Sequence, residues 1–130
     1  MGTITANIGN RNYETIIQSE SNTLSADEPI SSGGTNKGFS PHELLSAALA
    51  SCTCITLRMY ANRKQWNLDD VISSVTITND AKQNILTIHL KIELIGKLSA
   101  VERERLFEIS KHCPIHKVLI NSITIETELA

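Results

Sequence analysis

The clearest pattern in the chain is a strict alternation of apolar and polar positions over residues 85–95. The apolar set is Leu86, Ile88, Leu90, Ile92 and Leu94. This period of two predicts a β-strand with one buried and one exposed face. Residues 71–78 predict its antiparallel neighbour, joined by a polar turn over residues 79–84. The pair is therefore expected to lie in an antiparallel sheet covered on one side.

Shorter patterns predict strands near both ends of the chain. Residues 3–8 and 13–19 flank a stretch of turn residues and are expected to form a hairpin, with a third strand over residues 22–26. Residues 27–39 are punctuated by glycine and proline, which predicts a loop. Residues 122–129 close the chain as a predicted strand, with Ile123, Ile125, Thr127 and Leu129 on one face.

A long helix is predicted between these groups of strands. Ser40, Pro41 and Glu43 form the start signal of a capping box, and the helix continues to about Arg63. The helix is apolar nearly all round, which is typical of a buried helix. Because a monomer of this size can hardly surround it, the pattern predicts a dimer. Charged residues at its end are expected to lie in solvent (Arg58, Arg63 and Lys64).

A second capping box, from Ser99 to Glu102, predicts a second helix. Leu106, Ile109 and Cys113 share one face of it, Pro114 breaks or kinks it, and a short helical piece is expected over residues 116–121. Strands and helices do not alternate strictly along the chain, so the predicted class is α+β. The length of 130 residues fits a single domain over residues 1–130.

Composition narrows the possible functions. An apolar share of 41% excludes a disordered chain, and a net charge of −2 argues against binding to nucleic acid or to anionic membranes. The uncharged apolar stretch over residues 44–57 is short for a membrane span, and the first twenty residues do not resemble a signal peptide. Three cysteines are too few, and odd in number, for a secreted disulfide scaffold. We therefore expect a cytoplasmic protein with reduced thiols.

The cysteines are the candidate chemistry. Cys52 and Cys113 lie on the apolar stripes of their helices and are expected to point inward, whereas Cys54 lies about 200° round the helix from Cys52. Simple packing is the ordinary role of a buried cysteine. Nearby lysines and histidines would favour a Cys113 thiolate if they converged on it, while the end of the helix would oppose it. A zinc site made of Cys52, Cys54, Cys113 and His116 is the competing hypothesis, although the helix separates the first two sulfurs.

Two motifs resemble the OsmC/Ohr family, which comprises osmotically inducible and organic hydroperoxide resistance proteins. Residues 40–53, with the sequence SPHELLSAALASCT, resemble the motif of the central helix in that family. Residues 113–116, with the sequence CPIH, resemble its second cysteine motif. The two cysteines are 61 residues apart, a separation typical of the family, and the glycine-rich loop over residues 33–38 also fits. The resemblance extends from about residue 24 to the end.

The resemblance implies an intertwined homodimer whose antiparallel sheets wrap round long, buried central helices. It also implies a thiol-dependent peroxidase for organic hydroperoxides, with hydrogen peroxide as a further substrate to test. Cys52 would attack the peroxide and become a sulfenic acid, Cys113 would condense with it to a disulfide, and an external dithiol would reduce that disulfide. Arg11 would support the Cys52 thiolate and Glu43 would orient Arg11. No cofactor or metal is implied.

Several residues depart from the family pattern. His42 stands where the family glutamate usually follows the proline, so Glu43 is displaced by one position; Cys54 is an extra thiol, and His116 replaces a small polar residue. Arg11 is equally interpreted as an exposed hairpin charge and Glu43 as a helix cap. These departures keep a second hypothesis open, in which the same dimer is a non-catalytic small-molecule binder or redox sensor.

Overall fold

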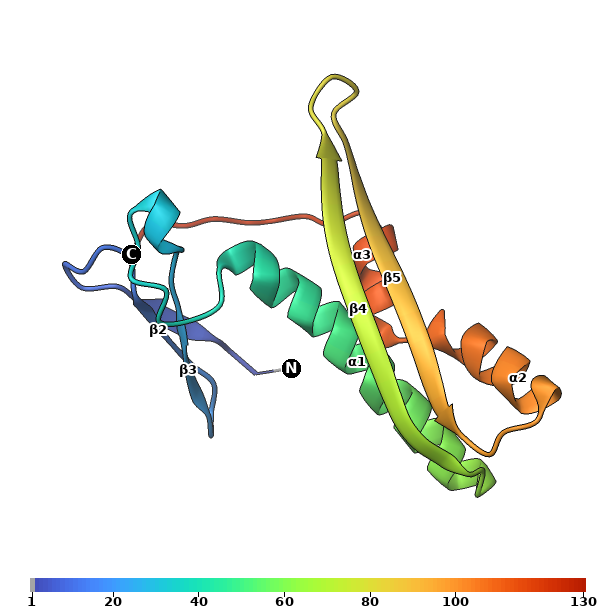
Figure 1. The fold of residues 1–130 in the computed structure, drawn as a ribbon. Coiled ribbons are helices and arrows are strands. Elements are labelled where there is room, and N and C mark those ends of the chain that lie inside the picture. Colours follow the sequence, from blue (N-terminus) through green and yellow to red (C-terminus); the bar gives the residue numbers. More distant parts are fainter. Residues whose placement is uncertain (1) are drawn as a thin grey trace. The chain divides into compact units, whose positions relative to one another are not determined.

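A computed structural model describes residues 2–130 of the chain (Figure 1). Its order of elements is β1 (Thr5–Asn7), β2 (Thr15–Gln18), β3 (Thr23–Ala26), η1 (Ile30–Ser32), α1 (Pro41–Lys64), β4 (Leu68–Asp80), β5 (Ile85–Gly96), α2 (Ala100–Ser110) and α3 (Pro114–Ile120). Antiparallel sheets and a long helix make the fold α+β, as predicted. The chain forms two compact units, the first ending at Leu45 and the second beginning at Ser46.

The first unit contains a three-stranded antiparallel sheet in the order β1-β2-β3. The hairpin predicted for the first two strands is present, and β3 pairs with β2 over its whole length. The loop that follows contains the short helical turn η1, which the sequence pattern did not predict. This loop leads from β3 to the start of α1 at Pro41.

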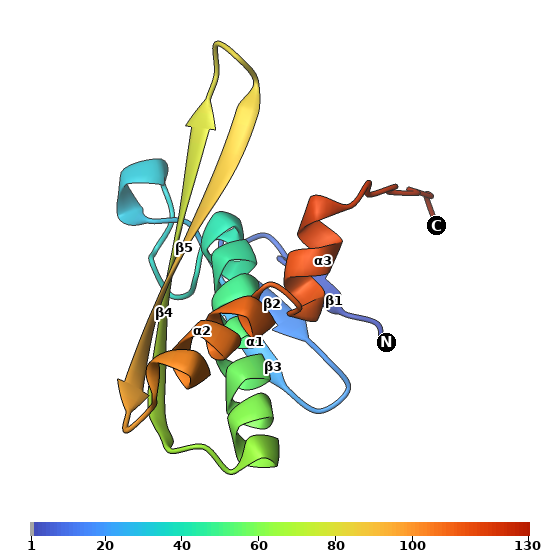
Figure 2. The same ribbon diagram turned by 90° about the vertical axis from the view of Figure 1, so that its right-hand side faces the viewer.

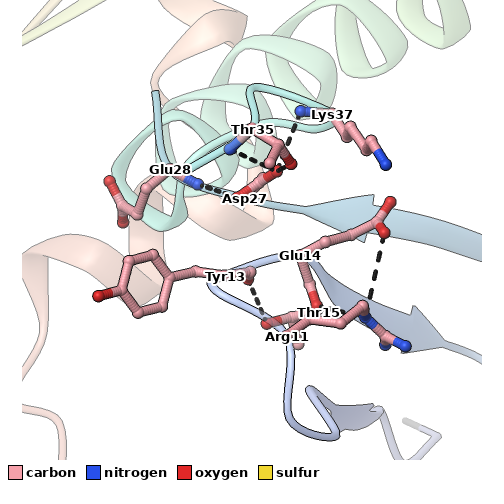
Figure 3. Close-up of polar contacts among 8 residues, drawn as sticks. All are labelled: Arg11, Tyr13, Glu14, Thr15, Asp27, Glu28, Thr35 and Lys37. Atoms are coloured by element: carbon pink, nitrogen blue, oxygen red, sulfur yellow. Dashed lines mark hydrogen bonds and ion pairs between the residues drawn. The ribbon is translucent and has the colours of Figure 1, made fainter. Parts of the chain in front are cut away.

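A single carboxylate organises that loop (Figure 3). Asp27 is 2% exposed, and its two oxygens accept hydrogen bonds from the backbone N–H groups of Glu28, Thr35 and Lys37 and from the Thr35 hydroxyl, at 2.5–3.3 Å. The Thr35 hydroxyl is the main cause that lowers the pKa of Asp27 to about 2, because all these bonds favour the charged form. The Asp27 carboxylate therefore joins the two ends of the loop between β3 and α1 through hydrogen bonds.

The second unit is built on the long hairpin of β4 and β5. The predicted alternation is confirmed along β5, where Ile88, Leu90 and Ile92 are partly buried and His89 and Lys91 are exposed. The strand ends at Gly96, whose φ of +147° is rarely adopted by other residues. A Cβ atom at Gly96 would lie 2.1 Å from the carbonyl oxygen of Asn67, so the close approach of these two backbone segments requires glycine.

The helix α1 runs beside this hairpin (Figure 1). It starts with the predicted capping box, in which Glu43 accepts a hydrogen bond from the Ser40 backbone N–H and Ser40 accepts one from the Glu43 N–H. One face of α1 packs into the core of the second unit, which contains Leu57, Tyr60, Ala61, Leu68 and Leu106. Trp66 packs on this core, and its ring meets that of Tyr60 in a T-shaped arrangement at a centroid distance of 5.6 Å.

The prediction that Arg58 lies free in solvent is wrong. Its guanidinium donates hydrogen bonds to the carbonyl oxygens of Leu68 at 2.7 Å and Asp69 at 3.2 Å. The reason is local, because the pairing of β4 with β5 shifts register between Leu68 and Asp70. Arg58 thus ties α1 to the start of the following strand.

The other face of α1 is open within a single chain. Ile55 is 54% exposed and Met59 is 65% exposed, so the helix is not buried all round by its own chain. The helix α1 also contains a stretch that is long and apolar enough to cross a membrane, a test that the core helix of a soluble protein passes as well. The full helix is thus longer than the stretch over residues 44–57 that was judged too short for a membrane span. A second subunit over the open face of α1 stays a prediction.

The last third of the chain begins with the predicted second capping box, in which Ser99 and Glu102 exchange hydrogen bonds at the start of α2. In Figure 2, α2 and α3 follow one another and the chain then leaves as an extended segment. The strand predicted over residues 122–129 does not form in this chain, where Ile125 is 83% exposed and Leu129 is 99% exposed. A strand needs a hydrogen-bonded neighbour, and the alternation of residues alone does not supply one.

Candidate active site

The structure brings Cys52 and Cys113 together. Cys52 comes from the middle of α1 and Cys113 from the residue directly before α3, and the Cys52 thiol lies close enough to Cys113 to help raise the pKa of that thiol. Both are free thiols. Cys113 is fully buried, whereas Cys52 is partly exposed and its sulfur also lies 4.0 Å from the Thr56 hydroxyl. A reagent from solvent therefore has access to only one member of this pair.

The place of Cys113 in the backbone differs from the prediction. The helix α2 ends at Ser110, and Pro114 begins α3 instead of ending α2, so Cys113 is the N-cap of α3. Proline suits the first position of a helix because its missing N–H needs no partner there. Backbone N–H groups of Ile115 and His116 consequently lie near enough to lower the pKa of Cys113, although the Cys113 side chain forms no cap hydrogen bond. Cys113 was expected at the C-terminal end of a helix, where the helix dipole disfavours a thiolate, but it lies at the N-terminal end of α3, where the dipole favours one.

Two effects compete at the Cys113 thiol. Burial is the largest, and together with the contact to Cys52 it raises the pKa of Cys113 above its ordinary value. The N–H groups of Ile115 and His116 lower that pKa without cancelling the effect of burial. The net result favours the protonated thiol at Cys113, which makes it a poor nucleophile until its proton is removed.

The cations near Cys113 in the sequence do not converge on it. Lys111 pairs with Glu108 at 3.6 Å and lies over the ring of Phe107, while His112 and Lys117 are exposed. None of these side chains is among the causes that shift the pKa of Cys113. Proximity along the chain was therefore a misleading guide to the electrostatics of this thiol.

Cys54 faces the opposite side of α1, as its position on the helix predicts. Its thiol contacts β4, where it donates toward the Ser73 hydroxyl at 3.3 Å and the Val71 carbonyl oxygen at 3.5 Å. The four residues of the hypothetical zinc site are therefore not gathered in one place. Among residues 2–130 no group of three or more histidine, cysteine, aspartate or glutamate side chains is arranged to hold a metal ion.

Arg11 and Glu43 have local partners in the first unit. Arg11 lies in the connection between β1 and β2, donates to the Glu14 carbonyl oxygen at 3.2 Å and forms a loose ion pair with the Glu14 carboxylate at 4.0 Å (Figure 3). Glu43 is held in the capping box with Ser40, and these hydrogen bonds lower its pKa. The cap interpretation of Glu43 is thus confirmed, and the roles of both residues toward Cys52 stay predictions.

A cavity that sequence reasoning missed lies one helical turn from the thiols. It has a volume of about 250 Å³ and is lined by Leu49, Leu86, Ile88, Leu90, His116, Leu119 and Ile120. Leu49 precedes Cys52 by three residues on α1, and His116 follows Cys113 by three residues on α3. The sequence pattern already places the lining residues of β5 on one face of that strand. Their convergence from α1, β5 and α3 could not be predicted from any one of them.

Comparison with known proteins identifies the family. A model of the family described as OsmC-like protein matches residues 34–128, which include both cysteine motifs. The chain belongs to the OsmC-like protein family. A comparison with curated proteins finds no significant match.

Solved structures of OsmC-like proteins share the fold. An OsmC-like protein from Mycoplasma pneumoniae is 25% identical, with a TM-score of 0.77 over 92% of this chain and 86% of that one. An organic hydroperoxide resistance protein OsmC from Legionella pneumophila is also 25% identical, with a TM-score of 0.65 over 92% and 89%. OhrB of Bacillus subtilis, named an organic hydroperoxide resistance protein, is 21% identical, with a TM-score of 0.62 over 92% and 90%. At this last identity the likeness concerns the fold alone.

Proposed function

We propose that this OsmC-like protein is a thiol-dependent peroxidase that reduces organic hydroperoxides, and that hydrogen peroxide is a further substrate. The observation that supports this most directly is the proximity of Cys52 and Cys113, of which only Cys52 is partly exposed. The organic hydroperoxide resistance protein OsmC of Legionella pneumophila, among the similar structures, supports the same class of substrate.

The proposed reaction has three steps. The Cys52 thiolate attacks the terminal oxygen of ROOH, the O–O bond breaks, and the alkoxide takes up a proton to leave as ROH, so that Cys52 becomes a sulfenic acid. The Cys113 thiol then loses its proton and attacks the Cys52 sulfur, which forms a disulfide and releases water. An external dithiol restores both thiols and is itself oxidised to a disulfide.

The difference in burial assigns the order of the two thiols. Cys52 is partly exposed and therefore open to a peroxide, whereas Cys113 is fully buried. The raised pKa of Cys113 also suits a thiol that waits for the sulfenic acid, because the protonated form does not compete for the peroxide. Cys54 takes no part in this proposal, since it faces β4.

Activation of Cys52 needs a cation, and we assign this role to Arg11 with Glu43 as its orienting partner. The ion pair of Arg11 with Glu14 is long, at 4.0 Å, and the Arg11 side chain is 44% exposed, so this guanidinium is weakly held by its local partner. The assignment rests on the resemblance to active family members. Glu43 would serve both the helix cap and Arg11 through its two carboxylate oxygens.

A homodimer is part of the proposal. The open face of α1 and the unpaired residues 122–130 are two apolar surfaces that a second copy of the chain would cover. Reduced thiols also fit a cytoplasmic protein, which we propose on that ground. The dithiol reductant and the peroxide are its small-molecule or protein partners.

The cavity beside the thiols favours a second candidate function. A non-catalytic binder or redox sensor would also use an apolar space of about 250 Å³. The two functions differ in one measurable quantity, because a binder would not consume hydroperoxide faster than a free thiol does.

The deciding experiment measures turnover of cumene hydroperoxide and tert-butyl hydroperoxide by the reduced protein, with a dithiol as reductant and intact mass recorded alongside. Wild type is expected to turn over many times and to lose about 2 Da on forming one disulfide. Cys52→Ser is expected to abolish turnover, and Cys113→Ser to leave Cys52 oxidised without a disulfide. Cys54→Ser is the matched control and is expected to retain full activity. Full activity in Cys52→Ser would refute the proposal.

A further inference from the structure

Thr56 places a hydroxyl group against the Cys52 sulfur. The two atoms are 4.0 Å apart, and among residues 2–130 this is the one hydrogen-bonding contact of the Thr56 side chain. The residues are four positions apart on α1, so they are neighbours on one face of the helix. Both are partly buried, which reduces the competition of water for this contact. The helix that carries Cys52 therefore also presents a hydrogen-bond donor to it.

The other hydroxyl groups in the middle of α1 are used differently. Thr53 donates to the backbone carbonyl oxygen four residues before it at 2.9 Å, and Ser51 donates to the one three residues before it at 3.3 Å. Such bonds to a preceding carbonyl are the ordinary use of serine and threonine inside a helix. In the described part of the chain Thr56 forms no bond of this kind, and its hydroxyl contacts the Cys52 sulfur instead.

The charge of the sulfur decides which atom of this pair donates. A thiolate has no proton and only accepts hydrogen bonds, whereas a hydroxyl donates one. A hydrogen bond to a charged acceptor is about twice as strong as one between neutral groups, so the hydroxyl favours the thiolate over the thiol. Cys113 is the titratable group that lies near Cys52 from the segment before α3, and its raised pKa keeps it protonated and uncharged near neutral pH.

We propose that Thr56 is a positioning residue for the reaction of Cys52, because its hydroxyl donates a hydrogen bond to the Cys52 thiolate, stabilises it and fixes its orientation. This inference rests on the proposed function only for its effect on turnover. Cys52 and Thr56 lie in one helix of the second unit, whereas Arg11, the proposed activating cation, lies in the first. The two contributions are therefore separable by mutation.

The first test measures the reactivity of Cys52 without any peroxide. Reduced protein that carries Cys54→Ser is alkylated with iodoacetamide over a range of pH, and fragment masses locate the label at Cys52. The thiolate displaces iodide, so the rate follows the thiolate population. Thr56→Val keeps the shape of the side chain and removes its hydroxyl. It is expected to shift the midpoint of the pH–rate profile upward by about half to one unit, which lowers the thiolate fraction below that midpoint by about three- to tenfold.

Two further variants isolate the hydroxyl. Thr56→Ser keeps it and should restore most of the wild-type profile, and Thr56→Ala lacks it and should behave as Thr56→Val. Ser51→Ala is the matched control, because it removes a hydroxyl of the same helix that bonds to the backbone. The proposal is overturned if Thr56→Val and Thr56→Ala keep the wild-type profile, if Thr56→Ser resembles Thr56→Val, or if Ser51→Ala shifts the profile equally.

The second test uses turnover and separates this proposal from the proposed function. At limiting tert-butyl hydroperoxide, Thr56→Val is expected to lower kcat/KM below the alkylation midpoint, and the loss should shrink as the pH rises above it. A loss of the same size at every pH would refute a role through the thiolate. If wild type turns over no hydroperoxide, the proposed function fails, and the alkylation profile alone decides the role of Thr56.

Discussion

Two neighbouring residues of α1 allow the stability of one chain to be separated from that of an assembly. Leu57 is fully buried in the core of the second unit, whereas Met59, two residues further on, is 65% exposed. We expect Leu57→Ala and Met59→Ala to differ in both size and kind of effect. The comparison uses one helix and one type of truncation, so differences in helix propensity between the two changes are small.

The magnitude for Leu57→Ala follows from its burial. Removing about three carbon atoms costs roughly 0.8 kcal/mol each in transfer free energy, and the cavity left in a rigid core raises the total to about 3–4 kcal/mol. For a chain of this size, each kcal/mol lowers Tm by about 3–6 °C, so the expected loss is about 10–20 °C. This loss should not depend on protein concentration.

Met59→Ala tests the proposed dimer. In a lone chain this exposed residue should change the free energy of unfolding by less than about 0.5 kcal/mol. If a second copy covers the open face of α1, the remaining exposed part of Met59 contributes about 1–2 kcal/mol per subunit. Two copies then weaken the dimer by about 2–4 kcal/mol, which is roughly 30- to 700-fold in Kd.

The assay is thermal unfolding over a wide range of protein concentration, combined with sedimentation equilibrium. A wild-type Tm that rises with concentration, and a smaller rise in Met59→Ala, would support the dimer. Two results would refute the reasoning. A loss below about 1 kcal/mol in Leu57→Ala would contradict the described core, and a Met59→Ala protein indistinguishable from wild type at every concentration would remove α1 from the interface.

Two further predictions concern backbone sites. Asp27→Asn should destabilise the protein above about pH 4, because the amide NH₂ of the asparagine would face backbone N–H donors. The pKa of Asp27 is lowered to about 2 in the folded protein, so the advantage of the wild type should be lost as the pH falls from about 4 through 2. Urea unfolding at several pH values measures it, and a pH-independent difference would contradict the role of the charge. Gly96→Ala should be strongly destabilising, since its Cβ would lie 2.1 Å from the Asn67 carbonyl oxygen; the same assay with Gly2→Ala, which meets no atom within 4 Å, is the control.

Local signals in the sequence predicted most of the fold. The capping boxes at Ser40 and Ser99 place the starts of α1 and α2 correctly, because each depends on residues only three positions apart. The alternation in β5 likewise reports burial on one face. The strand predicted for residues 122–129 failed because a strand depends on a neighbour that no local pattern specifies.

The candidate site was predicted less completely. The inward positions of Cys52 and Cys113 follow from helical periodicity, and the structure places their thiols close together. The end of α2 at Ser110 was not predicted, and this error reversed the expected effect of the backbone on Cys113. The Asp27 network was also missed, since it gathers backbone N–H groups up to ten residues away that carry no side-chain signal.

The proximity of Cys52 and Cys113 has a consequence for the unfolded chain. These residues are 61 positions apart, so a disulfide between them would close a loop that contains α1's second half, the β4–β5 hairpin and α2. Closing a loop of this length lowers the entropy of the unfolded state and stabilises the folded state by about 4 kcal/mol in the chain-entropy model. Oxidation would thus place most of the core residues of the second unit inside one covalently closed loop, and reduction to the two thiols would remove that constraint.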